Sequence, residues 1–198
     1  MSRESDVAGK GPTDADLVAA VRGGDVESFE TLIRRYERQA AAVSYRLLGN
    51  RSDSEDVLQN AYLKAYQALD SLQDPDRFGP WLLRIVSNLS LNYRRQRASR
   101  STLSLTATDT EKSDPASQMA DGSALLPDQV LISDELKDAI TFAMETLPQK
   151  QQLALTLFSI QGMPQKEVAE VMRCSVEAVK WHVFTARKAL REKLKGFF

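Results

Sequence analysis

The sequence is poor in the residues from which catalytic and metal centres are most often built. Its 198 residues include one cysteine, Cys174, and one histidine, His182. A His/Cys zinc site needs more ligands than these two. A single cysteine cannot form an internal disulfide, which fits a reducing compartment. The nine glycines form neither of the two common phosphate-loop spacings. We therefore expect no enzymatic activity, no catalytic residue, no cofactor and no metal.

Long apolar runs are also lacking. No stretch approaches the roughly 18 apolar residues that a membrane helix needs. The first dozen residues are polar and lack the apolar core of a signal peptide. A cytoplasmic protein without direct membrane insertion is therefore expected. Hydrophobic residues nevertheless make up 42% of the chain, so the protein is predicted to fold.

The net charge of −1 is small, but the charges are unevenly distributed. Residues 84–100 contain five arginines and no acid, and residues 179–195 contain six lysines or arginines and one glutamate. Residues 101–130, between these basic segments, carry five acids and one lysine. Two basic segments on either side of an acidic connector point to nucleic acid as a partner.

Apolar residues recur at intervals of three and four through most of the chain, which predicts an all-α protein without strands. Capping-box spacings begin helices at Thr13 and Ser52, and Asp25 caps the long helix between them. The periodicity is lost after a fourth helix and resumes near Ser133. Two small helical domains joined by a flexible linker are expected. The predicted parts are a disordered N-terminus (1–12), a first domain (13–97), an acidic linker (98–132) and a second domain (133–198).

The second domain is predicted to contain a helix-turn-helix. A short apolar helix meets a tight turn at residues 173–175, and Ser175 caps a long helix with Val179 and Val183 on its inner face. The opposite face has the size and chemistry to enter a major groove. An ordinary solvated basic helix is the alternative, but the turn and the cap favour DNA. The candidate duplex contacts are Ser175, Glu177, Lys180, Trp181, His182, Phe184, Thr185, Arg187 and Lys188.

The fourth helix of the first domain has the composition of a single-stranded DNA site. Arginines follow phosphates, aromatic rings stack on bases, and amides read exposed base edges. Phe78 and Trp81 share helical spacing with Leu82 and Ile85, so both are expected to lie at least partly in the core. The candidate contacts are Phe78, Trp81, Arg84, Asn88, Asn92, Arg94, Arg95 and Arg97.

A shorter helix before it carries acids and a glutamine on its polar side. From the residues alone, this is an ordinary amphipathic helix whose acids favour its N-terminus. The residues concerned are Asp53, Glu55, Asp56 and Gln59.

Three stretches of the chain, taken together, follow the pattern of one protein family. They read SEDVLQNAYLKAY, then FGPWLLRIVSNLSLNYRR, then LPQKQQLALTLFSIQGMPQKEVAEVMRCSVEAVKWHVFTARKALREKL. In this order and spacing, over about residues 14–194, the chain resembles the extracytoplasmic-function sigma factors of bacterial RNA polymerase. The resemblance implies a sigma factor of promoter-specific transcription initiation, often in a stress response. Residues 13–97 then correspond to sigma region 2 and residues 133–198 to region 4.

The resemblance also implies roles for the candidate residues. The helix with Asp53, Glu55, Asp56 and Gln59 would dock on the core polymerase, with Asp56 and Gln59 at the characteristic positions of the family. The loop at residues 71–78 and the helix after it would bind the −10 non-template strand and trap an extruded base. The linker would pass through the polymerase active-site and RNA-exit region, and the helix-turn-helix would read the −35 duplex. Implied partners are the core enzyme, promoter DNA and an anti-sigma factor, with a monomer when free of them.

Some positions depart from the family pattern. Trp181 and His182 stand where many relatives have Arg or Ser, Glu177 and its neighbour replace a Gly-Thr pair, and Asn92 replaces a common Asp. The promoter sequences of the family are therefore not carried over.

Two other classes of protein were weighed. A stand-alone helix-turn-helix regulator would normally bring a receiver domain with strands, which the first half lacks. A helical interaction module would leave both basic segments unexplained.

Overall fold

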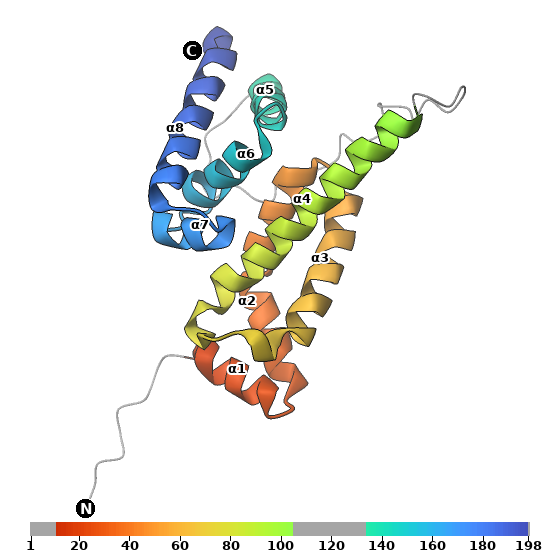
Figure 1. The fold of residues 1–198 in the computed structure, drawn as a ribbon, viewed down its shortest axis with the longest axis vertical. Helices are drawn as coiled ribbons and strands as arrows, with labels where there is room; N and C mark the ends of the chain where they lie inside the picture. The colour runs from red at the N-terminus through yellow and green to blue at the C-terminus, as the bar shows by residue number, and fades with distance from the viewer. Residues whose placement is uncertain (1–10, 105–133, 198) are drawn as a thin grey trace, which may run out of the picture.

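The computed structural model describes residues 11–104 and 134–197, and all the regular structure in these two ranges is helical (Figure 1). The predicted all-α class is therefore confirmed. Most of the predicted N-terminal segment and linker, residues 1–10 and 105–133, lie outside the described residues.

The first unit consists of four helices: α1 (Asp14–Arg22), α2 (Val26–Leu48), α3 (Arg51–Gln67) and α4 (Phe78–Ser104). The capping box predicted at α1 is present, because Thr13 Oγ1 accepts a hydrogen bond from the Asp16 backbone and Asp16 accepts one in return. The Thr13 donors also lower the pKa of Asp16. Asp25 caps α2 as predicted, and Gly49 ends α2 in the left-handed region at φ 67°.

The start of α3 differs from the prediction. The helix begins at Arg51, and its cap is Asn50, whose side-chain oxygen accepts a hydrogen bond from the Asp53 backbone at 2.9 Å. The predicted cap, Ser52, lies inside the first turn. Asparagine is as good an N-cap as serine, and Asn50 lies two positions before Ser52. The capping-box spacing alone therefore selected the wrong cap residue.

Two short 3-10 turns, η1 (Leu69–Ser71) and η2 (Pro75–Arg77), lead from α3 into α4. The first residue of α4, Phe78, is fully buried, with Phe29, Tyr36 and Trp81 around its ring at centroid distances of 6.5, 5.8 and 5.9 Å. This aromatic cluster holds the start of α4 against α2.

The far end of α4 also differs from the prediction. The helix continues to Ser104, whereas the linker was expected to begin at residue 98. Residues 98–104 contain Ala, Arg, Ser, Thr and Leu but neither Gly nor Pro, so nothing in their composition stops a helix that is already formed.

The second unit consists of α5 (Asp134–Glu145), α6 (Gln149–Leu155), α7 (Gln165–Met172) and α8 (Val176–Lys193), with a short turn η5 (Lys195–Phe197) at its end. A π-helical turn, η4 (Thr156–Ile160), extends α6. Between α7 and α8, Arg173 adopts a left-handed conformation at φ 51°, and Ser175 caps α8 by accepting from the Ala178 backbone at 3.1 Å. The predicted helix-turn-helix is thus present.

The two units lie side by side, with α7 against α4 and α6 against α2 (Figure 1). Their buried apolar residues form one continuous cluster, to which Leu83 and Met163 belong. In the two described ranges, no helix is long and apolar enough to cross a membrane.

Candidate nucleic-acid and polymerase interfaces

The acidic residues of α3 divide into two sets. The Asp53 carboxylate is mostly buried and accepts hydrogen bonds from Tyr93 Oη at 2.6 Å and from Arg97 at 3.0 Å, both on α4. The hydrogen bond to Asp53 is the main cause that raises the pKa of Tyr93. Glu55 forms an i,i+4 ion pair with Arg51 at 2.9 Å. Asp53 therefore joins α3 to α4, and Glu55 is tied to its own helix.

Asp56 and Gln59, in contrast, are exposed and lie one helical turn apart. Leu63, one further turn along the same face, is 57% exposed. Sequence reasoning missed Leu63, although a leucine on the polar side of an amphipathic helix was a visible signal. Together the three side chains form a small mixed surface, which we call the α3 face.

The structure places the predicted −10 residues in different environments. Phe78 is fully buried and packs in the aromatic cluster, so it is not accessible to DNA in this structure. The burial of Phe78 is as its helical spacing predicts, and its contact with DNA stays a prediction. Trp81, Arg84 and Tyr93 are half-buried, whereas Asn88, Asn92 and Arg95 are exposed.

A cavity of about 350 Å³ opens beside Trp81 and Arg84, between the loop before α4 and α7. Its size falls at the small end of the range for ligand pockets in proteins. Arg77, which sequence reasoning missed, lines it as well. The full lining is Ser71, Leu72, Gln73, Asp74, Arg77, Pro80, Trp81, Arg84 and Glu170.

Two of the predicted arginines make contacts within the protein. Arg97 pairs with Asp53, as described. Arg94 donates to Gln152 Oε1 at 2.6 Å and to the Glu145 carbonyl at 3.3 Å, both in the second unit. Arg95, which belongs to the same predicted set on α4, is exposed.

The predicted outer face of α8 is open to solvent. Trp181 and Phe184 are 58% and 69% exposed, which is unusual for aromatic side chains, and Lys180 and Lys188 lie beside them. The predicted inner residues Val179, Val183 and Ala186 are buried. Glu177 is exposed and Thr185 is half-buried, so this face matches the prediction from helical spacing.

Two of the predicted duplex contacts have structural roles, and a third is partly buried. Ser175 is the cap of α8. Arg187 donates to Ser159 Oγ at 3.0 Å and lies over the Phe158 ring at 5.7 Å, which directs it toward η4. His182 is half-buried, its Nδ1 has no hydrogen-bond partner among the described residues, and burial lowers its pKa, with a smaller effect from Lys150.

In residues 11–104 and 134–197, no group of three His, Cys, Asp or Glu side chains is arranged to hold a metal ion.

These features define a class: an all-helical protein with a helix-turn-helix unit and a second helical unit that carries arginines and a cavity beside its longest helix. Comparison with known families makes the assignment specific. Residues 32–100 match Sigma-70 region 2, and residues 137–190 match Sigma-70, region 4.

Individual relatives agree with these matches. The ECF RNA polymerase sigma-E factor of Escherichia coli (strain K12) is 33% identical over 184 residues, which cover 92% of this chain and 95% of that protein. The protein of the same name in Haemophilus influenzae is 30% identical, over 92% of this chain and 96% of its own. The chain therefore belongs to the extracytoplasmic-function (ECF) sigma factors.

Two solved structures are similar to the whole arrangement. CnrH in complex with the cytosolic domain of CnrY matches with a TM-score of 0.64 and 28% identity, over 92% of this chain and 97% of that one. The sigma factor RpoE in complex with the anti-sigma factor NepR, from Bartonella quintana, has a TM-score of 0.64 and 20% identity, over 85% of this chain and 98% of that one, and shows a shared fold.

Proposed function

We propose that this protein binds core RNA polymerase and directs promoter-specific transcription initiation, as a sigma factor and not as an enzyme. The observation that carries the proposal is the presence of both sigma regions, in order, in one chain whose relatives match over nearly their whole length. Each region brings a surface of the required chemistry: the α3 face in one, and the recognition face of α8 in the other.

The α3 face is the proposed contact with core polymerase. Asp56 and Gln59 are exposed, so their side chains are available to a partner. Leu63 adds an exposed apolar side chain on the same face. Asp53 supports this surface from behind, because it fixes α3 to α4 through Tyr93 and Arg97.

The outer face of α8 is the proposed reader of −35 duplex DNA. Lys180 and Lys188 can contact phosphates or guanine, while Trp181 and Phe184 can pack on thymine methyl groups and sugar edges. The cap at Ser175 and the buried valines fix the orientation of the helix. A fixed helix suits the reading of duplex DNA, whose groove is itself regular.

The loop before α4 and the exposed side of α4 are the proposed site for the −10 single strand. The cavity beside Trp81 and Arg84 supports this, because a base removed from the stack needs both an aromatic or apolar wall and polar groups at its edge. Asn88, Asn92 and Arg95 continue the same helix with amides and a positive charge at the surface.

We infer an anti-sigma factor as a further partner and the cytoplasm, where polymerase is found, as the compartment. The support for the first is that RpoE of Bartonella quintana was solved with an anti-sigma factor and that CnrH was solved with a domain of CnrY.

Binding of the purified protein to bacterial core polymerase tests the proposal. The wild-type chain is expected to bind tightly, and the Asp56→Ala/Gln59→Ala variant more weakly, by about tenfold to a hundredfold if both are central contacts. A control is Glu37→Ala, which removes one exposed carboxylate of α2 in the same unit. Equal loss in the control would point to a general effect of charge or stability.

A stand-alone regulator is the alternative that the same measurement addresses. Such a protein would bind duplex DNA unaided and ignore core polymerase. The sigma assignment predicts the reverse, with specific duplex binding seen once the holoenzyme has formed.

A further inference from the structure

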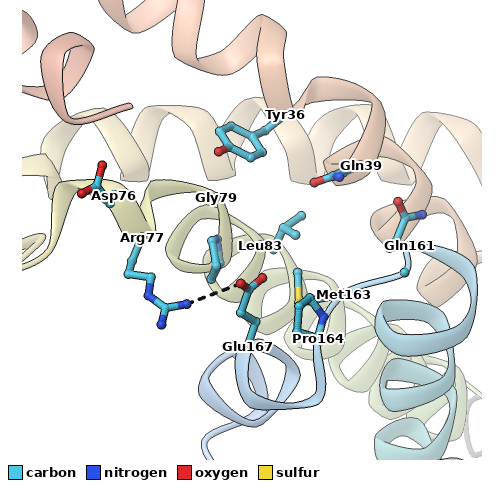
Figure 2. A pocket seen from close by; sticks show the side chains of 12 residues that line it. Tyr36, Gln39, Asp76, Arg77, Gly79, Leu83, Gln161, Met163, Pro164 and Glu167 are labelled. Carbon is cyan, nitrogen blue, oxygen red and sulfur yellow. Dashed lines mark hydrogen bonds and ion pairs between the residues drawn. The ribbon is translucent and has the colours of Figure 1, made fainter. Parts of the chain in front are cut away.

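One basic side chain at the entrance to α4 is held by the second unit. Arg77 ends η2 and forms ion pairs with Glu167 at 3.5 Å and with Glu170 at 3.6 Å. Both glutamates belong to α7, the first helix of the helix-turn-helix. Figure 2 shows Arg77 and Glu167 pointing toward each other at a second pocket between the two units, of about 480 Å³, which Tyr36 also lines.

The position of Arg77 suits a DNA phosphate. Its side chain is 43% exposed and lies at the rim of the cavity that Trp81 and Arg84 also line. A guanidinium binds carboxylate and phosphate through the same planar fork of N–H donors. Glu167 and Glu170 lie three residues apart on α7, so both carboxylates reach this fork. The backbone of a DNA strand that entered the cavity would pass the same place.

We propose that Arg77 binds a backbone phosphate of the −10 single strand and that Glu167 and Glu170 occupy this phosphate site when the two units are closed. The inference rests on the proposed function. It adds a DNA-binding residue to the first unit and makes the helix-turn-helix unit a competitor of the strand that the first unit binds.

A second contact strengthens the closed arrangement. Arg94, farther along α4, donates to Gln152 Oε1 at 2.6 Å, and the Gln152 amide donates to the Arg46 carbonyl at 2.6 Å. Gln152 is buried in the contact between the units. The second unit therefore contacts an arginine near the start of α4 and another farther along it, and both pairings are lost when the units separate.

The expected size of the effect follows from the exposure of these pairs. An exposed ion pair is typically worth up to about 1 kcal/mol, and apparent affinity falls in proportion to the fraction of molecules in the competent state. Removing both glutamates should therefore tighten binding of a single strand to the free protein by about threefold to tenfold.

The test uses the free full-length protein and a fluorescein-labelled, 12-nucleotide single-stranded DNA of mixed sequence, with binding followed by anisotropy. Glu167→Gln/Glu170→Gln is expected to bind the probe about threefold to tenfold more tightly than wild type. Because this variant also loses two negative charges relative to wild type, its matched control is Glu135→Gln/Glu192→Gln, which removes the charges of two exposed glutamates of the same unit.

A third variant identifies the strand contact. Adding Arg77→Gln to Glu167→Gln/Glu170→Gln should cancel the gain, because the freed guanidinium is then missing. Equal gain in the matched control, no gain at all, or a gain that survives Arg77→Gln would each overturn the proposal. Core polymerase binding is measured on the same wild-type preparation. If it holds while the gain is absent, only the present inference fails; if it is lost, the proposed function fails first.

Discussion

The two helical units present their proposed DNA-binding residues in opposite ways. In the second unit, Trp181 and Phe184 project into solvent from a helix that is capped and packed. In the first unit, Phe78 is buried, Arg97 is paired with Asp53, and Arg94 is bound to the other unit. The comparison indicates that the proposed duplex-binding face is preformed, whereas several residues of the proposed single-strand site are engaged by other groups of the protein.

The chemistry of the two targets gives a reason for this difference. Duplex DNA offers a regular groove that a rigid helix can enter without rearrangement. A single strand has no fixed shape, so its site consists of separate stacking and phosphate contacts that other groups can fill. Groups of the second unit contact Arg77 and Arg94, two of the arginines proposed for that site.

The largest expected effect comes from truncating the buried ring in the first unit. Phe78→Ala should lower the free energy of unfolding by about 3–5 kcal/mol, because it removes the centre of the aromatic cluster. Chemical denaturation measures this loss, and Phe184→Ala, on the exposed face of α8, is the matched control with a change within about 0.5 kcal/mol. Equal stability of the two variants would break the comparison between a buried and an exposed aromatic residue.

A glycine beside that ring gives the next effect. A Cβ at Gly79 would lie 2.4 Å from Tyr36 Cε1, and the Tyr36 hydroxyl is itself hydrogen-bonded to Asp14, so the ring has little freedom to move. Gly79→Ala should therefore destabilise the protein by about 1–3 kcal/mol through overpacking. Gly196→Ala, where nothing lies within 4 Å of the added carbon, is the control for thermal unfolding. An unchanged melting temperature for Gly79→Ala would contradict the close packing of α4 on α2.

On the second unit, the effect should appear in DNA binding instead of stability. Trp181→Ala removes a side chain that is 58% exposed, so the free energy of unfolding should change by no more than about 0.5 kcal/mol. Binding of holoenzyme to a promoter duplex should weaken by roughly fivefold, equivalent to about 1 kcal/mol. A filter-binding titration at fixed salt measures it. Val26→Ala, an exposed apolar residue of the first unit, serves as the control.

The smallest effect concerns pH. Burial lowers the pKa of His182 below its ordinary value of 6.5, so the unfolded chain takes up a proton more readily than the folded one. Stability from this source is present above pH 6.5 and declines as the pH falls from there toward the lowered pKa. The decline should be slight. In His182→Gln, the difference between the free energies of unfolding at pH 7.5 and pH 5.5 should be smaller by this contribution. A slope that persists in the variant would assign it to other groups.

Helical periodicity and local caps determined much of the fold. The caps at Thr13, Asp25 and Ser175, and the buried stripe of α8, follow from interactions between residues a few positions apart. Errors arose where two neighbouring residues could both cap, at Asn50 and Ser52, and where a polar composition was taken to end a helix that continues to Ser104.

The interfaces could be predicted only in part. The exposed side of α8 and the pair Asp56 and Gln59 were accessible to sequence reasoning because exposure on a helix follows its period. Arg77 and Leu63 were missed: the first is recognisable only from the cavity beside it, whereas the second, a leucine on the polar side of α3, was a visible signal in the sequence.

The sequence by itself therefore determined the helices, the helix-turn-helix and the resemblance to ECF sigma factors, because these depend on short-range spacing and on family motifs. Only the tertiary structure decided which charged side chains are free. Asp53 meets Arg97 across 44 positions and Arg77 meets Glu167 across 90, and contacts between residues so far apart in the chain arise from packing of whole helices, which no local pattern encodes.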